Sequence, residues 1–426
     1  MHYRFTVWDG GGTVPPELGV ARRLVARGHA VSVLGDPTLA RDVAAAGADF
    51  SPWRRAPHRR SQALEDDLIK DWECRSPAQV LGRLRDRLIA GPAAAFAEEV
   101  RLAHRDRPAD VLVASGPLLG ALVGAESLDV PTVALMSNIY NRPAPGLPPF
   151  GTGLPPARGP LGRTRDRALG SVVSRMWNRG LPELNAARAA LGLPPIRDLW
   201  EQLDRAARVL VLTSPAFDFP ARLPDNVRYV GPVLDDPAWA ETVDPPAGAE
   251  PLVLVGLSST RMKGQVAVLR RIVDALSTLP VRGVVTTGLG TDPADVPGAD
   301  RIVVVRSAPH AALLGSAAAT VTHAGHGTLL KTLAAGVPAV CLPMGRDQRD
   351  NVVRAQRHGA VVRVRPRASA DRIAAAVRRV LADPSYRRGA QMLGARLRAD
   401  ADSTALIDEL EAVATTRPNP RPTATT

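Results

Sequence analysis

Short apolar runs alternate along the first half of the chain with segments whose apolar residues repeat at helical spacing. The run at residues 3–8 (YRFTVW) is followed by glycines and then by Leu18, Ala21, Leu24 and Val25, whose spacing predicts a helix. Similar runs lie at residues 30–35, 109–114 and 130–136 and near residue 210. Continuous apolar strands are typical of a parallel sheet buried on both faces, so the pattern predicts a doubly wound α/β domain.

A polar, proline-rich passage at residues 234–250 interrupts this alternation and has the composition of an interdomain linker. Apolar runs and helical patterns resume after it with PLVLVGLSST and QVAVLRRIVDALSTL, and they predict a second α/β domain. The expected organisation is a first domain (1–233), the linker, a second domain (251–385), C-terminal helices closing back towards the first domain (386–412) and a tail of disordered composition (413–426).

Two long loops interrupt the first domain. Residues 54–76 are charged and rich in arginine, and residues 141–163 are rich in proline and glycine. Loops of this length inside a compact domain are usually functional. We expect both to border a pocket.

Composition narrows the classes of function. The net charge is +12, but arginines scattered among acidic residues carry most of it, and no dense basic tract with interleaved aromatic residues occurs, so we expect no nucleic-acid binding. No apolar stretch approaches the roughly 18 residues that span a bilayer, so we expect no integral membrane association. Cys74 and Cys341 stand alone, which argues against structural zinc and favours a reducing compartment; a cytoplasmic protein is the expectation.

The densest group of candidate functional residues follows the apolar run that ends near residue 322. His323, Gly325, Gly327 and Thr328 form a turn that leads into a helix beginning at about Thr328. Helix amino termini present unpaired N–H groups and a partial positive charge, so this turn can hold phosphate oxygens, with the histidine beside them. The next apolar run leads into Asp347-Gln348, which can bind hydroxyl groups at the carboxyl edge of the sheet.

These elements resemble the donor-binding signature of family 1 glycosyltransferases with the GT-B fold, the class that glycosylates natural products. The signature contains an H-x-G-x-G-T turn, A-A-G-V-P, a proline and D-Q. Here the matching residues are His323, Gly325, Gly327, Thr328, the stretch 334–338, Pro343, Asp347 and Gln348. The actinobacterial macrolide-type branch is the most similar. The resemblance implies two Rossmann-like doubly wound domains that face a central cleft.

The resemblance also implies where the nucleotide-sugar donor binds. The donor-binding residues carried across by position are Ser258, Ser259, Thr260, Ser307, Ala308, His310, His323, Gly325, His326, Gly327, Thr328, Asp347 and Gln348. Two positions depart from the family pattern. Ser307 stands where an aromatic residue often stacks on the base, and Lys331 stands where a glutamate usually holds the ribose hydroxyls, a role that lysine cannot take as an acceptor. The nucleotide is therefore left open between UDP and dTDP.

The opening stretch WDGGGTVPPE departs further. Related transferases have G-x-G-H-x-x-P here, with the histidine as general base and an aspartate from a later strand end orienting it. Thr13 takes the place of that histidine and Ser115 the place of the aspartate. A threonine hydroxyl is not basic near neutral pH, so the usual dyad is missing. The catalytic candidates that remain are Thr13, Ser115 and Asp9.

Three hypotheses explain the missing dyad. A nearby carboxylate can replace the base, with Asp9, Glu17, Asp66, Asp67 and Asp71 as candidates whose pKa burial would raise. Alternatively, the acceptor is acidic enough that positioning suffices. In the third hypothesis, the protein binds sugar nucleotides without efficient turnover.

The resulting expectation is an inverting, metal-independent transferase that moves a sugar from a UDP- or dTDP-sugar to a small hydrophobic aglycone such as a polyketide. The donor is a co-substrate and no cofactor is expected, since helix dipole and histidine take the place of a cation. Gly12, Asp66 and Asn138 are expected to contact the acceptor. A homodimer is compatible with the sequence. The alternatives are a sugar-nucleotide-binding accessory protein and a sugar-nucleotide epimerase of the same fold.

Overall fold

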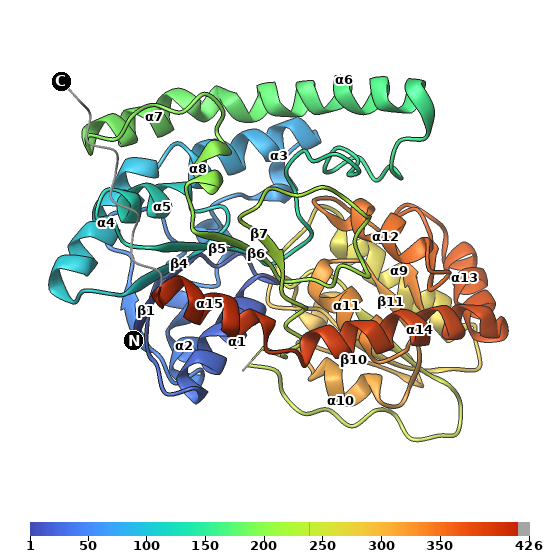
Figure 1. Cartoon of the computed structure of the whole chain (residues 1–426). Helices are drawn as coiled ribbons and strands as arrows, with labels where there is room; N and C mark the ends of the chain where they lie inside the picture. Colours follow the sequence, from blue (N-terminus) through green and yellow to red (C-terminus); the bar gives the residue numbers. More distant parts are fainter. Residues whose placement is uncertain (238, 416–426) are drawn as a thin grey trace.

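The computed structural model describes residues 1–237 and 239–415 and contains one parallel β-sheet in each half of the chain (Figure 1). The first sheet has the strand order β3-β2-β1-β4-β5-β6-β7, and every pairing in it is parallel. The predicted α/β class is confirmed. The strands are β1 (His2–Val7), β2 (Ala30–Gly35), β3 (Asp49–Pro52), β4 (Val111–Ser115), β5 (Thr132–Met136), β6 (Arg208–Val211) and β7 (Val227–Tyr229).

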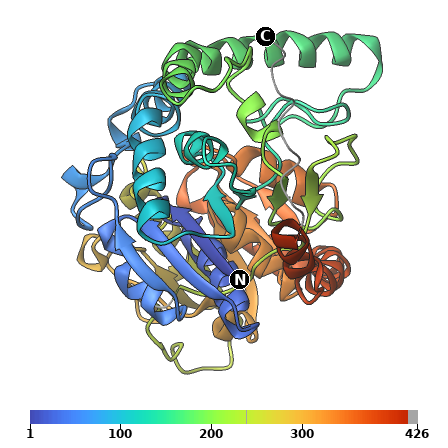
Figure 2. The same ribbon diagram turned by 60° about the vertical axis from the view of Figure 1, so that its left-hand side comes forward.

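Helices cover both faces of this sheet. Leu18 of α1 packs in the core on one face, and Phe96 of α4 and Leu119 of α5 pack in the core on the other. The long helix α6 and helix α7 run along one side of the molecule in both views (Figures 1 and 2). The helices of this half are α1 (Val14–Ala26), α2 (Ala40–Ala45), α3 (Pro77–Leu84), α4 (Ala93–Asp106), α5 (Leu119–Glu126), α6 (Gly159–Trp177), α7 (Leu181–Ala190) and α8 (Glu201–Asp204). Shorter helical turns are η1 (Pro37–Leu39), η2 (Leu64–Asp66), η3 (Asp71–Glu73), η4 (Arg85–Ile89) and η5 (Asn178–Gly180).

The second sheet has the order β10-β9-β8-β11-β12-β13 and is also parallel throughout. Leu269 of α9 and Ile373 of α13 pack on one face, and Leu333 of α11 and Leu393 of α14 pack on the other. The strands are β8 (Leu252–Gly256), β9 (Arg282–Thr286), β10 (Ile302–Val305), β11 (Ala317–Thr322), β12 (Ala339–Cys341) and β13 (Val361–Arg363). The helices are α9 (Gln265–Ser277), η6 (Pro293–Asp295), α10 (His310–Leu314), α11 (His326–Ala334), α12 (Gln348–Gln356), α13 (Ala370–Ala382), α14 (Pro384–Ala401) and α15 (Ala405–Thr415).

Two predicted boundaries are wrong. Residues 413–415, assigned to the tail, belong to α15, because Val413 is buried in the core of the first domain; residues 416–426 lie outside the described residues. The predicted loop at 141–163 ends earlier, since α6 begins at Gly159 and carries Pro160 in its first turn, where a missing N–H costs nothing. Helix α14 packs on the second domain, and α15, which follows it, packs on the first (Figure 1).

Each sheet has one point where the strand order reverses direction. It lies between β1 and β4 in the first sheet and between β8 and β11 in the second. Loops after neighbouring strands diverge at such a switch point and leave a crevice at the carboxyl edge of the sheet, where ligands bind in open α/β folds. Asp9, Ser115, Ser258 and His323 lie at or just after the ends of these four strands.

Candidate active site between the two domains

The predicted donor residues lie at the carboxyl edge of three neighbouring strands of the second sheet. Ser258, Ser259 and Thr260 follow β8, His323 follows β11, and Asp347 lies in the loop after β12, directly before α12. The hydroxyls of Ser258 and Thr260 are 3.1 Å apart and both residues are buried. The switch point between β8 and β11 therefore carries the two loops that the resemblance assigns to the phosphates.

Helix α11 begins at His326, two residues before the predicted start, with Gly325 as its N-cap residue. The first-turn N–H groups of Gly327 and Thr328 consequently have no partner within the helix and are available to an anion. The residue before the cap, Ala324, has a φ of +67°, a left-handed conformation that is uncommon for a residue with a side chain. Strain of this kind is typical of functional sites.

Both histidines of this turn are held neutral. Burial lowers the pKa of His323 to about 4 and the pKa of His326 to about 3. The Nε2 atom of His326 is buried and has no hydrogen-bond partner among the described residues. Neutral imidazoles beside a helix amino terminus can donate hydrogen bonds to phosphate oxygens.

Asp347 and Gln348 are placed differently from each other. The Asp347 carboxylate accepts a hydrogen bond from Asn351 Nδ2 at 2.9 Å, and burial raises its pKa. Gln348 Oε1 accepts the backbone N–H groups of Met344 and Gly345 at 2.6 and 2.9 Å, so this amide braces its own loop. A direct sugar contact by Gln348 stays a prediction.

The linker covers the two donor-side positions that depart from the family pattern. Lys331 Nζ forms an ion pair with linker residue Asp236 at 2.7 Å, and both side chains are largely buried. Asp236 also accepts the backbone N–H of Ala311 at 2.9 Å, next to His310 in α10. Ser307 exchanges hydrogen bonds with the linker backbone at Trp239 and Glu241. Lys331 is therefore a partner of the linker and not a freely solvated residue.

The glycines after β1 lie directly against the donor loop of the other domain. A Cβ added to Gly11 would be 2.5 Å from Thr260 Cγ2 and 2.9 Å from Ser259 Oγ, and its φ is +73°. Only glycine satisfies both the backbone conformation and the close approach. Gly12 is similarly near, since its carbonyl oxygen would be 3.8 Å from a Cβ added to Gly327.

Thr13 precedes α1 but does not cap it. It occupies the N-cap position with helical φ and ψ, and its hydroxyl makes no capping hydrogen bond. This hydroxyl is buried and has no partner among residues 1–237 and 239–415. A buried hydroxyl without a partner therefore stands at the position that the resemblance assigns to acceptor chemistry.

Ser115 is bonded to a carboxylate one helical turn beyond Thr13. The hydroxyls of Ser115 and Ser137 both donate to Glu17, the second over 2.8 Å. Glu17 is 2% exposed, and burial raises its pKa to about 7, against the lowering effect of the two hydroxyls. The position of the family's aspartate therefore still has a carboxylate beside it, contributed by α1 instead of β4.

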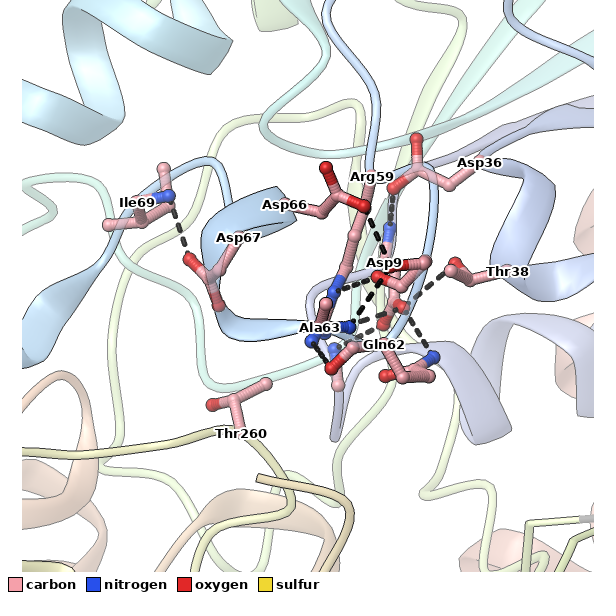
Figure 3. Close-up of polar contacts among 12 residues, drawn as sticks. Asp9, Asp36, Thr38, Arg59, Gln62, Ala63, Asp66, Asp67, Ile69 and Thr260 are labelled. Atoms are coloured by element: carbon pink, nitrogen blue, oxygen red, sulfur yellow. Dashed lines mark hydrogen bonds and ion pairs between the residues drawn. The ribbon is translucent and has the colours of Figure 1, made fainter. Parts of the chain in front are cut away.

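Asp9 is the centre of a hydrogen-bonded cluster (Figure 3). Its carboxylate accepts hydrogen bonds from Thr38 Oγ1 at 2.9 Å, Gln62 Nε2 at 3.2 Å and Gly11 N at 3.2 Å, and it lies 3.6 Å from Arg59 Nη1. These donors hold the loop at 59–62 against the end of β1. The carboxylate is occupied by structural partners.

Asp36, at the end of β2, was not among the predicted residues. It accepts the backbone N–H of Asp9 at 2.7 Å, and burial together with the neighbouring Asp9 raises its pKa to about 7. The other carboxylate oxygen, Oδ1, has no partner among the described residues. A small pocket between the domains is lined by residues of both halves: Trp8, Asp9, Gly10, Asp36, Arg59, Asp67, Leu68, Ile69, Thr260 and Arg346.

The two other predicted acceptor residues lie on either side of this region. Asp66 accepts hydrogen bonds from Ser61 Oγ at 2.7 Å and from Arg60 at 3.0 Å, and its pKa is lowered chiefly by the serine hydroxyl. Asn138 follows β5 directly after Ser137. Contact of either residue with the acceptor stays a prediction.

Both long loops of the first domain are bonded to the second domain. Arg346 pairs with Asp71 of the 54–76 loop at 2.7 Å. Asp350 accepts the backbone N–H groups of Gly151 and Gly153 at 2.5 and 2.7 Å, and burial raises its pKa to about 6. The loops expected to border a pocket therefore lie in the crevice between the domains.

The chain is similar to known glycosyltransferases over most of its length. The model of the family described as UDP-glucoronosyl and UDP-glucosyl transferase matches residues 175–405. The 4'-demethylrebeccamycin synthase of Lentzea aerocolonigenes is 31% identical over 417 residues, which cover 95% of this chain and 96% of the relative. A PGL/p-HBAD biosynthesis glycosyltransferase of Mycobacterium tuberculosis is 33% identical over 178 residues, or 40% of each chain.

Solved structures show the same fold. The glycotransferase of kitacinnamycin superposes with a TM-score of 0.72 at 22% identity, covering 97% of this chain and 98% of that chain. The glycosyltransferase SsfS6 of Streptomyces sp. SF2575, complexed with thymidine diphosphate, superposes with a TM-score of 0.64 at 20% identity, covering 96% and 99%. In the described part of this chain, no helix has the length and apolar character needed to cross a membrane.

Proposed function

This chain belongs to the UDP-glucoronosyl and UDP-glucosyl transferase family and is a glycosyltransferase, and from that premise we propose its reaction. It transfers a sugar from a UDP- or dTDP-sugar to a small hydrophobic natural-product acceptor, with inversion at the anomeric carbon. The name of the 4'-demethylrebeccamycin synthase and the thymidine diphosphate bound to SsfS6 support this substrate class. The transferred group leaves the diphosphate as the acceptor attacks from the opposite face.

The observation that carries the proposal is the arrangement of the two switch points across one crevice. Gly11 and Gly12 of the first domain contact the loops of Thr260 and Gly327 of the second domain. Diphosphate bound at the start of α11 would therefore lie beside the turn that contains Thr13. Donor and acceptor are brought together without a covalent enzyme intermediate, which is the geometry that direct displacement needs.

The charge of the leaving diphosphate is met by the protein in this proposal. The first-turn N–H groups of α11 and the neutral imidazole of His323 donate hydrogen bonds to it. The reaction is accordingly proposed to be metal-independent and to require no cofactor. The acceptor is proposed to lie on the first-domain side of the crevice, where Thr13 follows β1 and Ser137 and Asn138 follow β5.

The test is calorimetric titration with UDP, dTDP and GDP in buffer containing EDTA, followed by incubation of the corresponding glucose donors with a panel of aglycones. We expect His323→Ala to weaken binding of the preferred diphosphate roughly 10- to 100-fold, since it removes a hydrogen bond to a charged group. The matched control is His104→Ala on α4 of the first domain, which should bind as the wild type does.

Each alternative has its own outcome. If His323→Ala binds the nucleoside diphosphate as tightly as the wild type does, the proposed diphosphate site at the start of α11 is wrong. Binding without transfer or hydrolysis by the wild type favours an accessory protein, and interconversion of the sugar without an acceptor favours an epimerase.

A further inference from the structure

Glu17 lies at the switch point of the first sheet. It is on α1, the helix that follows β1, and the two hydroxyls bonded to it come from the end of β4 and from the residue after β5. Thr13, one helical turn before it, and Ser115, bonded to it, are the two positions at which the family's dyad is missing. A single carboxylate thus lies between the two empty dyad positions.

Its surroundings suit a group that takes up a proton. Each oxygen of the Glu17 carboxylate accepts one serine hydroxyl, Oε2 from Ser115 and Oε1 from Ser137. The pKa of about 7 is set by burial and these two hydroxyls. Among the described residues, no charged group is a cause of this shift; Arg22 and Arg23, further along α1, pair with Asp235.

The other carboxylates of the crevice are less available. Asp9 accepts three hydrogen bonds and faces Arg59, and Asp71 pairs with Arg346. Asp67 accepts the backbone N–H groups of Ile69 and Lys70.

Asp66 and Asp36 differ in their surroundings. Asp66 accepts hydrogen bonds from Arg60 and Ser61, and this hydrogen bonding lowers its pKa. Asp36 is the strongest rival, because it is buried, has an open oxygen and lines the pocket between the domains. It lies at the end of β2, however, beside the carboxylate of Asp9 and on the far side of β1 from β4.

We propose that Glu17, acting through the hydroxyl of Ser137, accepts the proton of the acceptor nucleophile and so replaces the missing dyad. This inference rests on the proposed function. Ser137 is the relay because it is next to Asn138, the predicted acceptor contact, and is 8% exposed where Ser115 is 1% exposed. Ser115 positions the carboxylate.

In the proposed step, the acceptor oxygen forms a bond to the anomeric carbon while the bond from that carbon to the diphosphate oxygen breaks. The electron pair of the broken bond leaves with the diphosphate. The acceptor proton passes to Ser137 Oγ, and the serine's own proton passes to the Glu17 carboxylate. The products are the glycoside, the nucleoside diphosphate and protonated Glu17, which releases its proton to solvent.

The experiment compares acceptors that do and do not need deprotonation. Phenol and 4-nitrophenol are offered with UDP-glucose and dTDP-glucose at about pH 8, where phenol is neutral and nitrophenol is ionised. We expect Glu17→Gln to lower kcat/KM for phenol by about 10²- to 10⁴-fold, the usual contribution of a general base, and to affect nitrophenol far less. Glu98→Gln on α4, an exposed glutamate paired with Arg101, is the matched control and should retain wild-type rates.

The pH profile separates a chemical role from a structural one. Wild-type turnover of phenol should rise with pH through about 7 as Glu17 ionises. Glu17→Gln should lose this limb, Glu17→Asp should keep it at a reduced rate, and Ser137→Ala should slow phenol more than nitrophenol. Thermal unfolding and diphosphate titration of each variant show that it is folded and binds donor.

Other results overturn the inference. If Glu17→Gln lowers kcat/KM equally for phenol and 4-nitrophenol, Glu17 has a structural role. If Glu17→Gln leaves the rate unchanged, Glu17 takes no part in the reaction. If Asp36→Asn, and not Glu17→Gln, abolishes the rise of turnover with pH near 7, Asp36 is the group that accepts the proton. Full activity of Ser137→Ala refutes the relay. Failure of the proposed function is a separate result, because the wild type would then bind no diphosphate or glycosylate neither phenol.

Discussion

At the residue scale, Glu17 and the donor-side residues reach the crevice in different ways: the donor-side residues are neighbours in the sequence, and the partners of Glu17 come from distant strands. His323 to Thr328 and Asp347-Gln348 form contiguous motifs, so their common location could be inferred from the order of residues alone. Glu17 is bonded to residues 98 and 120 positions away, and only the fold brings them together. The sequence nevertheless contained one usable signal, because a glutamate four residues after Thr13 lies on the same side of α1.

Asp9, the predicted carboxylate candidate, is expected to act mainly on stability. An asparagine would present an amide N–H₂ where the Oδ2 atom now accepts hydrogen bonds from Thr38 and Gln62 and faces Arg59. We expect Asp9→Asn to lower the free energy of unfolding by about 1–3 kcal/mol, as for other lost buried hydrogen bonds. Chemical denaturation measures this change.

A neighbouring aspartate is the control for this variant. Asp67 accepts only backbone N–H groups through Oδ1, which an asparagine oxygen can still accept, so Asp67→Asn should be nearly neutral. If Asp9→Asn is as stable as the wild type but loses the limb of the pH profile near 7, Asp9 is the base after all.

At the element scale, the central strands were predicted because a doubly covered parallel sheet demands continuous apolar runs, whereas the short edge strands β3 and β13 were not. Helix starts were less accurate. α11 begins at His326 because Gly325 takes the cap, and α6 begins inside a proline-rich segment that composition alone assigned to a loop. The role of the linker was not predictable either, since its composition indicates flexibility and its contacts are tertiary.

Consecutive residues fasten the linker to different domains. Asp235 pairs with Arg22 and Arg23 of α1, and Asp236 pairs with Lys331 of α11. The same linker contacts Ser307, the residue at the expected base position. The linker segment formed by Asp236, Trp239 and Glu241 therefore lines the region where the resemblance places the base and ribose.

This arrangement makes two adjacent aspartates distinguishable. Asp236→Asn should weaken binding of UDP or dTDP about 3- to 10-fold. The substitution removes the largely buried ion pair with Lys331, so the linker segment beside the nucleotide is held less firmly in place. Asp235→Asn should leave nucleotide affinity unchanged, since its partners lie on α1. Calorimetry on the two variants decides this, and tighter binding by Asp236→Asn would mean that the linker competes with the nucleotide.

At the scale of the whole molecule, buried carboxyl groups make stability depend on pH. Burial raises the pKa of Glu17 and Asp36 to about 7 and of Asp350 to about 6. The folded protein therefore holds protons that the unfolded chain has released above about pH 4. Each such group makes the folded state less stable as pH rises towards its folded pKa.

Buried histidines act in the opposite direction over part of this range. The pKa values of His310 and His323 fall to about 4 and that of His326 to about 3, with burial as the main cause. The unfolded chain therefore binds more protons at these positions up to about pH 6.5, and stability rises with pH there. The two sets of groups oppose each other, and towards pH 7 the histidine effect weakens first, because the unfolded histidine pKa of about 6.5 lies below the folded pKa of about 7 of Glu17 and Asp36.

We expect the thermal midpoint to change little between about pH 5 and 6.5 and to fall modestly between about pH 6.5 and 7.5, because each proton that the folded state loses there changes the free energy of unfolding by at most roughly 1.4 kcal/mol per pH unit. Glu17→Gln should reduce that fall, because it removes one of the two groups with a pKa of about 7. Differential scanning calorimetry across this range provides the measurement. An increase of the thermal midpoint as the pH is raised above about 6.5 would contradict the raised pKa values of Glu17 and Asp36.

The contacts of Asp350 also bear on how such proteins can be recombined. Its carboxylate, in the second domain, accepts the backbone N–H groups of Gly151 and Gly153 in a loop of the first domain. A hybrid enzyme that joins this first half to the second half of a relative at the linker would sever that connection unless the relative also has an acidic residue there. The linker separates the two domains in the sequence, but contacts such as those of Asp350 cross this boundary. A functional hybrid therefore needs an acidic residue at position 350 together with the loop that contains Gly151 and Gly153.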